Sequence, residues 1–174
     1  MALRIVRCTE DDIDRIVAIG KETYFDTFAG YCSKDIMEAY LAEAFERTKI
    51  FSEVRNALSE FYFGYLDAVP VGYIKLNIGK AQSDLQEQNG LEIERIYVKK
   101  DYKGQGIGTQ LIGFGIHRAI QQKMDFVWLG VWVRNSDAIS FYRKNGFMEA
   151  GVHPFLMGDE VQTDFIMRRD VLTQ

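Results

Sequence analysis

Cysteine, proline, histidine and long hydrophobic runs are all scarce in this chain of 174 residues. Two cysteines, Cys8 and Cys32, without a CxxC pair and with few histidines, exclude a disulfide framework and a zinc site, so we expect no metal and two thiols buried as small hydrophobic side chains. The longest apolar runs fall well short of the ~20 residues that span a bilayer, and residues 1–10 lack the apolar region of a signal peptide. We therefore expect no membrane segment and a cytoplasmic location.

The charge balance is slightly acidic, with 21 Lys and Arg against 25 Asp and Glu and a net charge of −4. An acidic chain lacks the basic footprint of sequence-independent nucleic-acid binding, and it suits a cationic partner better. Hydrophobic residues at 47% and charged residues at 26% are typical of a globular protein. At this length we expect a single domain over residues 1–174.

The order of the patterns predicts an α/β protein with a partly parallel, mixed sheet. Helices are expected after Thr9, which can act as an N-cap, and after Ser33, and Gly146 is expected to end the last helix. The predicted strands are 3–7, 61–66, 71–78, 91–98, 126–132, 147–152 and 161–167. Besides the helix that begins after Thr9, helices are predicted at 33–45, 48–58, 106–122 and 135–145. Residues 81–90 are predicted to form a polar surface loop.

A glycine-rich turn follows the strand at 91–98 and precedes a helix. Glycines at 104, 106 and 108 let the backbone adopt positive φ and approach a ligand closely, while the helix start presents unpaired N–H groups and the positive end of its dipole. Those features together form a pyrophosphate site. The spacing matches neither a Walker A sequence nor a dinucleotide-binding fingerprint. A plain turn in a tight strand-to-helix junction is the alternative.

A second pattern follows the apolar strand at 126–132. Asn135, Ala138 and Tyr142 share one face of the predicted helix. Asn135 can cap the helix or bind a ligand amide, and the phenol of Tyr142 can donate a proton as a general acid. An amphipathic helix with Tyr142 in its core or rim is the alternative.

The two patterns, in this order, resemble the GNAT acetyltransferase superfamily. Residues 103–108 match its [Q/R]-x-x-G-x-[G/A] loop with Lys103 in place of Gln or Arg, and Asn135, Ala138, Phe141, Tyr142, Gly146 and Phe147 match its later motif. The resemblance implies an acetyl-CoA-dependent N-acetyltransferase without a metal, with a mixed central sheet of about seven strands flanked by about four helices.

The resemblance also implies roles for particular residues. Backbone groups of Ile96 and Val98 would bind the pantetheine arm, an amine would attack the thioester directly, and Tyr142 would protonate the thiolate. The remaining residues implied to bind the cofactor are Lys103, Gly104, Gln105, Gly106, Ile107, Gly108, Thr109 and Asn135.

A general base is expected on the strand at 91–98. Glu92 and Glu94 lie on the same side of this strand by the two-residue period, and Glu94 is nearer the expected thioester. Surface carboxylates on a strand edge are the alternative for both residues.

Within the superfamily the chain is similar to the PaiA-type bacterial polyamine acetyltransferases, in stretches that include 22–28, 91–98, 128–132 and 157–164. This similarity implies spermidine or spermine as substrate. Glu22 and Asp26 share a helix face, and carboxylates beside aromatic rings suit a flexible polycation. Glu22, Tyr24, Asp26 and Glu92 are thus expected to bind the substrate.

Several expectations accompany this reading. Phe25 and Phe28 are expected in the core, and His153 is expected to be a surface residue in a turn, with a second proton carrier as the alternative. Acetylation of protein N-termini or another amine, and a non-catalytic acyl-CoA-binding regulator, are the alternative functions. A homodimer is left open.

Overall fold

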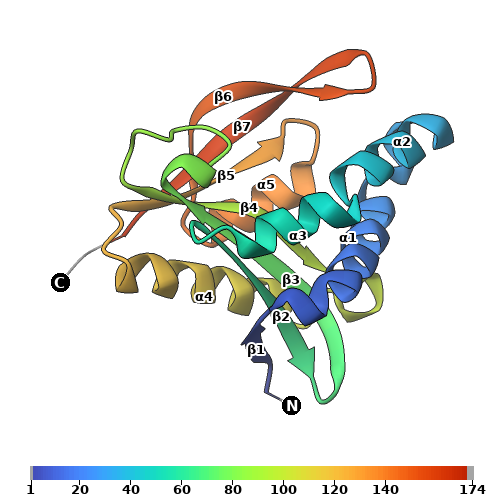
Figure 1. The fold of residues 1–174 in the computed structure, drawn as a ribbon. Helices are drawn as coiled ribbons and strands as arrows, with labels where there is room; N and C mark the ends of the chain where they lie inside the picture. The colour runs from blue at the N-terminus through green and yellow to red at the C-terminus, as the bar shows by residue number, and fades with distance from the viewer. Residues whose placement is uncertain (1, 172–174) are drawn as a thin grey trace. The chain divides into compact units, whose positions relative to one another are not determined.

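The computed structural model describes residues 2–171, and its strands form one seven-stranded mixed sheet in the order β1-β2-β3-β4-β5-β7-β6 (Figure 1). The strands are β1 Arg4–Arg7, β2 Ser59–Leu66, β3 Val69–Ile78, β4 Gly90–Val98, β5 Phe126–Trp132, β6 Met148–Met157 and β7 Glu160–Asp170. The α-helices are α1 Ile13–Phe28, α2 Lys34–Ala44, α3 Arg47–Arg55, α4 Ile107–Gln121 and α5 Ser136–Lys144. The predicted α/β class and mixed sheet are confirmed, with one α-helix more than the family resemblance implied.

The chain divides into two compact units that interleave in sequence. The first unit comprises the chain up to Lys75 together with Arg95–Leu111, and the second comprises Leu76–Glu94 together with the chain from Ile112 onward. The single domain over residues 1–174 stays a prediction. None of the helices in the described part of the chain combines the length and apolar character needed to cross a bilayer.

In the first unit, α1 begins after a short 3-10 turn, Glu10–Asp12, rather than at Thr9 itself. Thr9 still provides the cap, because its hydroxyl accepts from the Asp11 N–H while its own N–H donates to the Asp12 carboxylate at 2.9 Å. Ile13, Ile16 and Ile19 follow at helical spacing and are all buried. The capping box therefore sets the register that turns this apolar face toward the core.

The core of the first unit lies between the helices α1–α3 and the strands β2 and β3. Phe45, which follows α2, packs against Gly20 of α1 so closely that a side chain at Gly20 would overlap its ring. The other side of this sheet region holds Leu111 at the start of α4, in contact range of Gly64 and Gly72. The buried core residues here are Cys8, Ile13, Ile16, Ile19, Ala44, Phe45, Ile50, Phe61, Phe63 and Tyr73.

In the second unit, β5 pairs in parallel with β4 and antiparallel with β7. The parallel pairing runs only from Gly90–Phe126 to Glu92–Trp128, whereas the pairing with β7 covers all of β5. The hairpin of β6 and β7 continues past the end of β5 (Figure 1), and both strands are longer than predicted. The placement of His153 in a turn was wrong, because His153 lies within β6 and pairs with Asp164.

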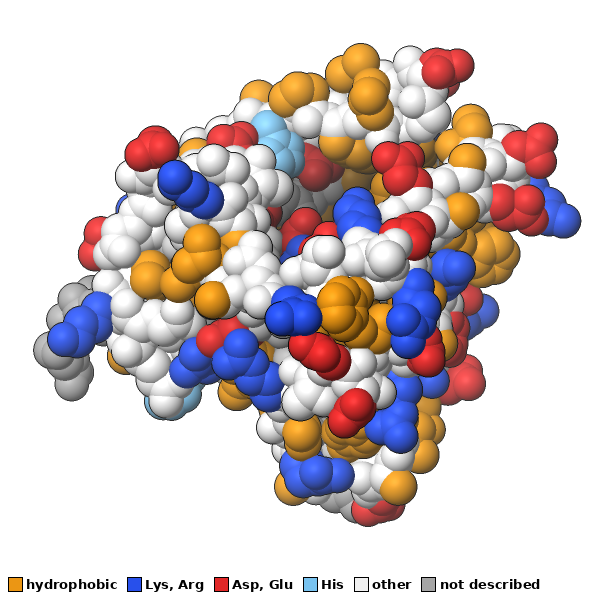
Figure 2. Space-filling view, viewed as in Figure 1, with side chains coloured by type: hydrophobic (Ala, Val, Ile, Leu, Met, Phe, Trp, Pro, Cys, Tyr) orange, Lys and Arg blue, Asp and Glu red, His pale blue; other side chains and the backbone are white. Residues whose placement is uncertain are grey.

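One face of this hairpin carries exposed apolar side chains, which Figure 2 shows in orange along β6 and β7. Val152, Leu156 and Val161 are all exposed, while their neighbours His153 and Phe155 are half-buried on the opposite face. The alternation follows the two-residue period of a strand. The hairpin therefore faces the rest of the second unit with the side that carries His153 and Phe155, and the side that carries Val152, Leu156 and Val161 is exposed.

Helix α5 has the ends that the sequence predicted. The Asn135 side chain accepts from the Ala138 N–H at 3.3 Å, and Gly146 follows the helix with a φ of 87°. A positive φ at this position favours glycine over residues with a Cβ. The cap and the stop set the two ends of the helix that carries Tyr142.

Two helix glycines give opposite predictions for stability. Gly20→Ala should lower the free energy of unfolding by about 1–3 kcal/mol, because the new methyl group overlaps the Phe45 ring. Gly113→Ala in α4 should raise it by about 0.5–1 kcal/mol, because no atom of the described residues outside the adjoining backbone of α4 lies within 4 Å of the new methyl group and alanine favours the helix. Urea unfolding of both variants and the wild type measures the difference. A Gly20→Ala variant as stable as wild type would contradict the packing described for α1.

Candidate functional site

The candidate site residues fall in both compact units, and the glycine-rich turn lies in the first. Lys103 is extended, Gly104 and Gly106 have φ values of 77° and 78°, and α4 begins at Ile107. Both glycines have open space where a Cβ would stand, so neither conformation results from crowding. The turn therefore needs glycine at these two positions for its backbone conformation, as the sequence predicted, whereas Gly108 lies in the first turn of α4 without a positive φ.

The start of α4 presents unpaired donors on this turn. The first hydrogen bond of the helix runs from the Gln110 N–H to the Gly106 carbonyl at 3.1 Å, so the N–H groups from Gly106 to Thr109 precede it. Ile107 and Leu111 are buried and anchor the helix, whereas residues 103–106 and Thr109 are exposed. This arrangement can bind an anion through backbone groups and the helix dipole.

Backbone groups of β4 lead toward the glycine-rich turn. The Lys99 N–H donates to the Val71 carbonyl at 2.8 Å, so the backbone groups of Lys99 face β3. Successive residues of a strand point these groups to alternate sides, so those of Val98 and Ile96 point away from β3. The register that pairs β4 with β5 ends at Glu92 and includes neither residue. Their role in binding a cofactor stays a prediction.

The acidic face of α1 also lies in the first unit. Glu22 and Asp26 are both exposed, and Glu22 pairs with Lys99 at 3.5 Å. Tyr24 instead turns inward and stacks on Tyr40 with ring centroids 4.4 Å apart, and burial raises its pKa. The carboxylates and Tyr24 therefore occupy different sides of the helix, since two residues along a helix differ by about 200°.

The core placement of Phe25 was wrong. Phe25 is 49% exposed, whereas Phe28 is half-buried against Tyr24 with centroids 4.5 Å apart. Cys8 is buried as expected, and burial raises the pKa of its thiol, while Cys32 is only half-buried. Apolar residues on a helix next to a charged face cannot be assigned to core or rim by type alone.

Tyr142 lies on α5 in the second unit. Its ring is half-buried between Phe141 and Phe147, with centroid distances of 5.4 and 6.1 Å. Burial raises the pKa of the phenol, because the phenolate is poorly stabilised among apolar rings. The hydroxyl therefore keeps its proton throughout the neutral range, which is the state that a proton donor needs.

The two predicted carboxylates of β4 are brought together by a third residue. The Asn77 amide of β3 donates to Glu92 at 2.9 Å and to Glu94 at 3.0 Å. Glu92 is only 2% exposed and accepts further bonds from the N–H and the hydroxyl of Ser83, whereas Glu94 is exposed. Burial raises the pKa of Glu92, and the charge of Glu94 raises it further, while the hydrogen bonds act in the opposite direction. The surface alternative is thus wrong for Glu92.

The segment after β3 is a site feature that the sequence analysis missed. It was predicted to be a polar surface loop, but Gln82 is 1% exposed and accepts from the Trp128 indole at 2.7 Å. Its neighbours Ser83 and Asp84 bind Glu92 and His153. The available signal was a tryptophan in an apolar strand, whose indole N–H needs a hydrogen-bond acceptor when it is buried.

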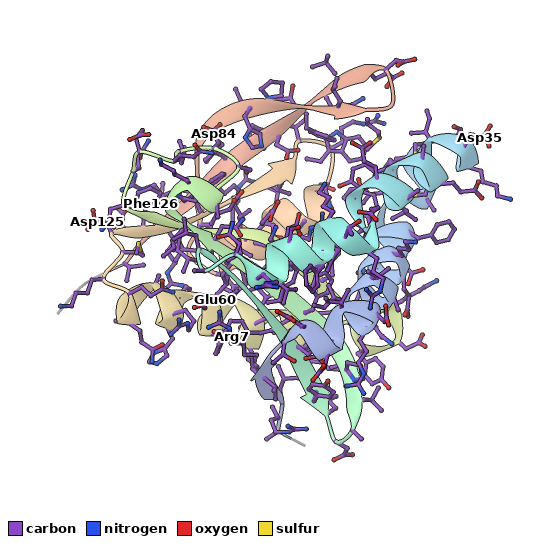
Figure 3. All side chains as sticks on the ribbon, in the orientation of Figure 1. Arg7, Asp35, Glu60, Asp84, Asp125 and Phe126 are labelled. Carbon is purple, nitrogen blue, oxygen red and sulfur yellow. The ribbon has the colours of Figure 1, made fainter. Side chains whose placement is uncertain are left out.

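His153 lies between two carboxylates in the second unit. Its Nδ1 is 3.4 Å from Asp84, which Figure 3 labels beside the β6–β7 hairpin, and its Nε2 is 3.4 Å from Asp164. The bond to Asp164 is the main cause that raises the pKa of His153, against the effect of burial. A Cβ at Gly130 would stand 3.0 Å from the ring, so the glycine leaves room for the imidazole.

In the described part of the chain no three or more His, Cys, Asp or Glu residues gather as a metal site would require.

The chain resembles known acetyltransferases both in sequence and in fold. Residues 21–147 match the acetyltransferase (GNAT) family. An uncharacterized N-acetyltransferase of Lactobacillus delbrueckii is 36% identical over 167 residues, 96% of either chain, and a spermidine N(1)-acetyltransferase of Thermoplasma acidophilum is 26% identical over 97% of this chain and 98% of its own. The crystal structure of a PaiA N-acetyltransferase from T. acidophilum in complex with coenzyme A superposes with a TM-score of 0.81 at 25% identity, covering 98% and 99% of the two chains.

The His153 contacts predict a pH-dependent contribution to stability. The pKa of His153 is higher in the folded than in the unfolded protein. Its contribution to the free energy of unfolding is therefore complete below the unfolded pKa of about 6.5 and is lost as pH rises through the folded pKa. His153→Gln should therefore cost up to about 1 kcal/mol more at about pH 5.5 than at about pH 9. Urea unfolding at both pH values, within a double-mutant cycle with Asp164→Asn, measures this coupling. A cost that does not change with pH would contradict it.

Proposed function

Since the chain belongs to the GNAT acetyltransferase family, we propose that it transfers the acetyl group of acetyl-CoA to an amine of a small polyamine such as spermidine or spermine. The observation that carries the proposal is the turn before α4, where two glycines with positive φ leave open space beside unpaired N–H groups. Lys103 at its start adds a positive charge. A pyrophosphate needs these features and no metal.

Acetyl-CoA would supply the acetyl group as a thioester. The backbone of residues 103–109 would bind its pyrophosphate, and Ile96 and Val98 would offer backbone groups to the pantetheine amides. Asn135 already caps α5 with its side chain, so its contribution to cofactor binding would come in addition to that role. The relative that was crystallised with coenzyme A supports the same class of cofactor.

The reaction needs a base and an acid. A polyamine nitrogen arrives protonated, since a simple amine has a pKa of about 10. The exposed carboxylate of Glu94 would accept one of its protons. The nitrogen would then attack the thioester carbon. As the C–N bond forms and the C–S bond breaks, Tyr142 would protonate the departing thiolate, and the second proton shed by the attacking nitrogen would restore the phenol. The Tyr142 phenol is protonated before the reaction, as a proton donor has to be.

A polycation suits the acidic groups on the chain. Glu22 and Asp26 are exposed on α1, and Asp84 and Glu94 are carboxylates of the second unit. The name of the Thermoplasma spermidine N(1)-acetyltransferase supports this substrate class, although Glu22 already pairs with Lys99 and would bind less strongly than a free carboxylate. Glu92 is buried, so it would act on the substrate through its neighbours. We place the enzyme in the cytoplasm, without nucleic-acid or membrane partners, and the homodimer stays a prediction.

Two other functions make different predictions. An N-terminal acetyltransferase would act on peptide amines, and a non-catalytic acyl-CoA-binding regulator would bind the cofactor without releasing CoA. The retained acid and base candidates, Tyr142 and Glu94, favour an enzyme, since a regulator needs neither.

The proposed substrate class is tested by a CoA-release assay with spermidine, spermine, monoamines, N-terminal peptides and aminoglycosides. We expect kcat/KM for the polyamines to exceed that for the monoamines by about tenfold or more, because each further ion pair or cation–π contact contributes about 1 kcal/mol. Gly106→Val is the matched negative control, because a branched side chain at positive φ closes the open turn. Preference for a peptide would overturn the polyamine proposal, and full acetyl-CoA binding by Gly106→Val in calorimetry would overturn the turn assignment.

Tyr142→Phe should lower kcat by about 100-fold or more while the Kd for acetyl-CoA changes less than about twofold, because the variant keeps the ring and loses only the hydroxyl that donates the proton. Tyr65→Phe on β2 is the control for removal of a hydroxyl elsewhere. Steady-state kinetics across pH with calorimetric titration of CoA separates the two effects. An unchanged kcat at every pH means that another group protonates the thiolate.

A further inference from the structure

Asn77 is the buried link between the two carboxylates of β4. Its side chain is 1% exposed, and its Nδ2 donates to Glu92 Oε1 at 2.9 Å and to Glu94 Oε2 at 3.0 Å. An amide nitrogen has two hydrogens, so one donates to each carboxylate. The orientation of this amide is therefore set by its partners, because the amide oxygen would face two acceptors if the group were turned over.

The two carboxylates of β4 differ in their exposure to solvent. Glu92 is buried and accepts from Asn77 and from Ser83, whereas Glu94 is exposed and is accessible to a ligand. Glu92 therefore cannot receive a substrate directly in this conformation. It can instead hold Asn77, which in turn contacts the accessible carboxylate.

The contact restricts Glu94 in two ways. A carboxylate on an exposed strand residue samples several rotamers, and a hydrogen bond from a buried, fixed donor selects one of them. A donor also stabilises the charged form of the carboxylate that accepts from it. Glu92 is the charged group that the contacts of Asn77 bring against Glu94, and its negative charge opposes this effect.

We propose that Asn77 is a positioning residue for Glu94, which it holds in one orientation and in its proton-accepting form, and that Glu92 fixes Asn77 in turn. The proposal rests on the proposed role of Glu94 as the base. Asn77 lies on β3, outside the two motifs of the family, and would thus be a further residue on which the reaction depends. Buried Glu92 would support Asn77 instead of contacting the substrate.

Asn77→Ala tests the proposal in the full-length protein. The acid limb of the kcat/KM profile should move to higher pH by about half a unit to one unit, because Glu94 loses a donor to its charged form. One unit below the wild-type limb, kcat/KM should fall about three- to tenfold, while KM for acetyl-CoA stays within about twofold. A purely structural role would lower activity by the same factor at every pH.

Ser83→Ala is the matched control. It removes a donor from Glu92 and leaves the bond between Asn77 and Glu94, so the acid limb should stay in place or move to lower pH. If both variants shift the limb upward by the same amount, the effect passes through Glu92 and the proposal is overturned. Asn77→Ser, which keeps one donor, replaces Asn77→Ala if urea unfolding shows that the alanine variant is not folded.

Glu94→Gln distinguishes this proposal from the proposed function. If Glu94→Gln retains the wild-type rate and acid limb, Glu94 is not the base and the proposed mechanism fails with it. If Glu94→Gln loses the acid limb but Asn77→Ala retains the wild-type profile, the base assignment stands and the positioning role alone is overturned.

Discussion

The burial of the Glu92 carboxylate constrains the structure of the second unit. An ionised carboxylate without partners is strongly destabilising in a protein interior, so its oxygens need donors. Asn77 supplies one from β3, and Ser83 supplies both its N–H and its hydroxyl. Because Ser83 has to reach Glu92, its neighbours Gln82 and Asp84 are brought to Trp128 and His153. The hydrogen bonds of this buried carboxylate thus fix Ser83, and Gln82 and Asp84 have partners of their own on either side of it.

The two units contribute different kinds of chemistry. In the first unit the candidate cofactor-binding groups are backbone N–H groups, and its apolar core and the buried Ile107 and Leu111 hold them in place. In the second unit the candidate groups are side chains, and hydrogen bonds orient them. A site of the first kind tolerates changes of side chain that keep the backbone path, whereas a site of the second kind depends on each residue type. Lys103, which stands where the family motif has Gln or Arg, is a side-chain change of the kind that such a backbone site tolerates.

The sequence predicted those features that depend on neighbouring residues. Caps at Ser33 and Asn135, the stop at Gly146 and the glycine-rich turn rely on contacts within a few positions, so each carries a local signal. The missed features depend on distant partners: Gln82 binds a residue 46 positions away, and Asp84 binds one 69 positions away. Such pairs have no period or spacing in the sequence. Asn77 was missed for the same reason, since a lone polar residue in a buried strand has meaning only beside Glu92.

The segment Gln82–Asp84 attaches successive side chains to β5, β4 and β6. Surface loops usually accept insertions and deletions, because their side chains have no fixed partners. Here one added residue would displace every following side chain from its partner at once. Although its composition is that of a variable loop, this segment is a poor location for an inserted tag or epitope, and relatives that differ in length should differ elsewhere.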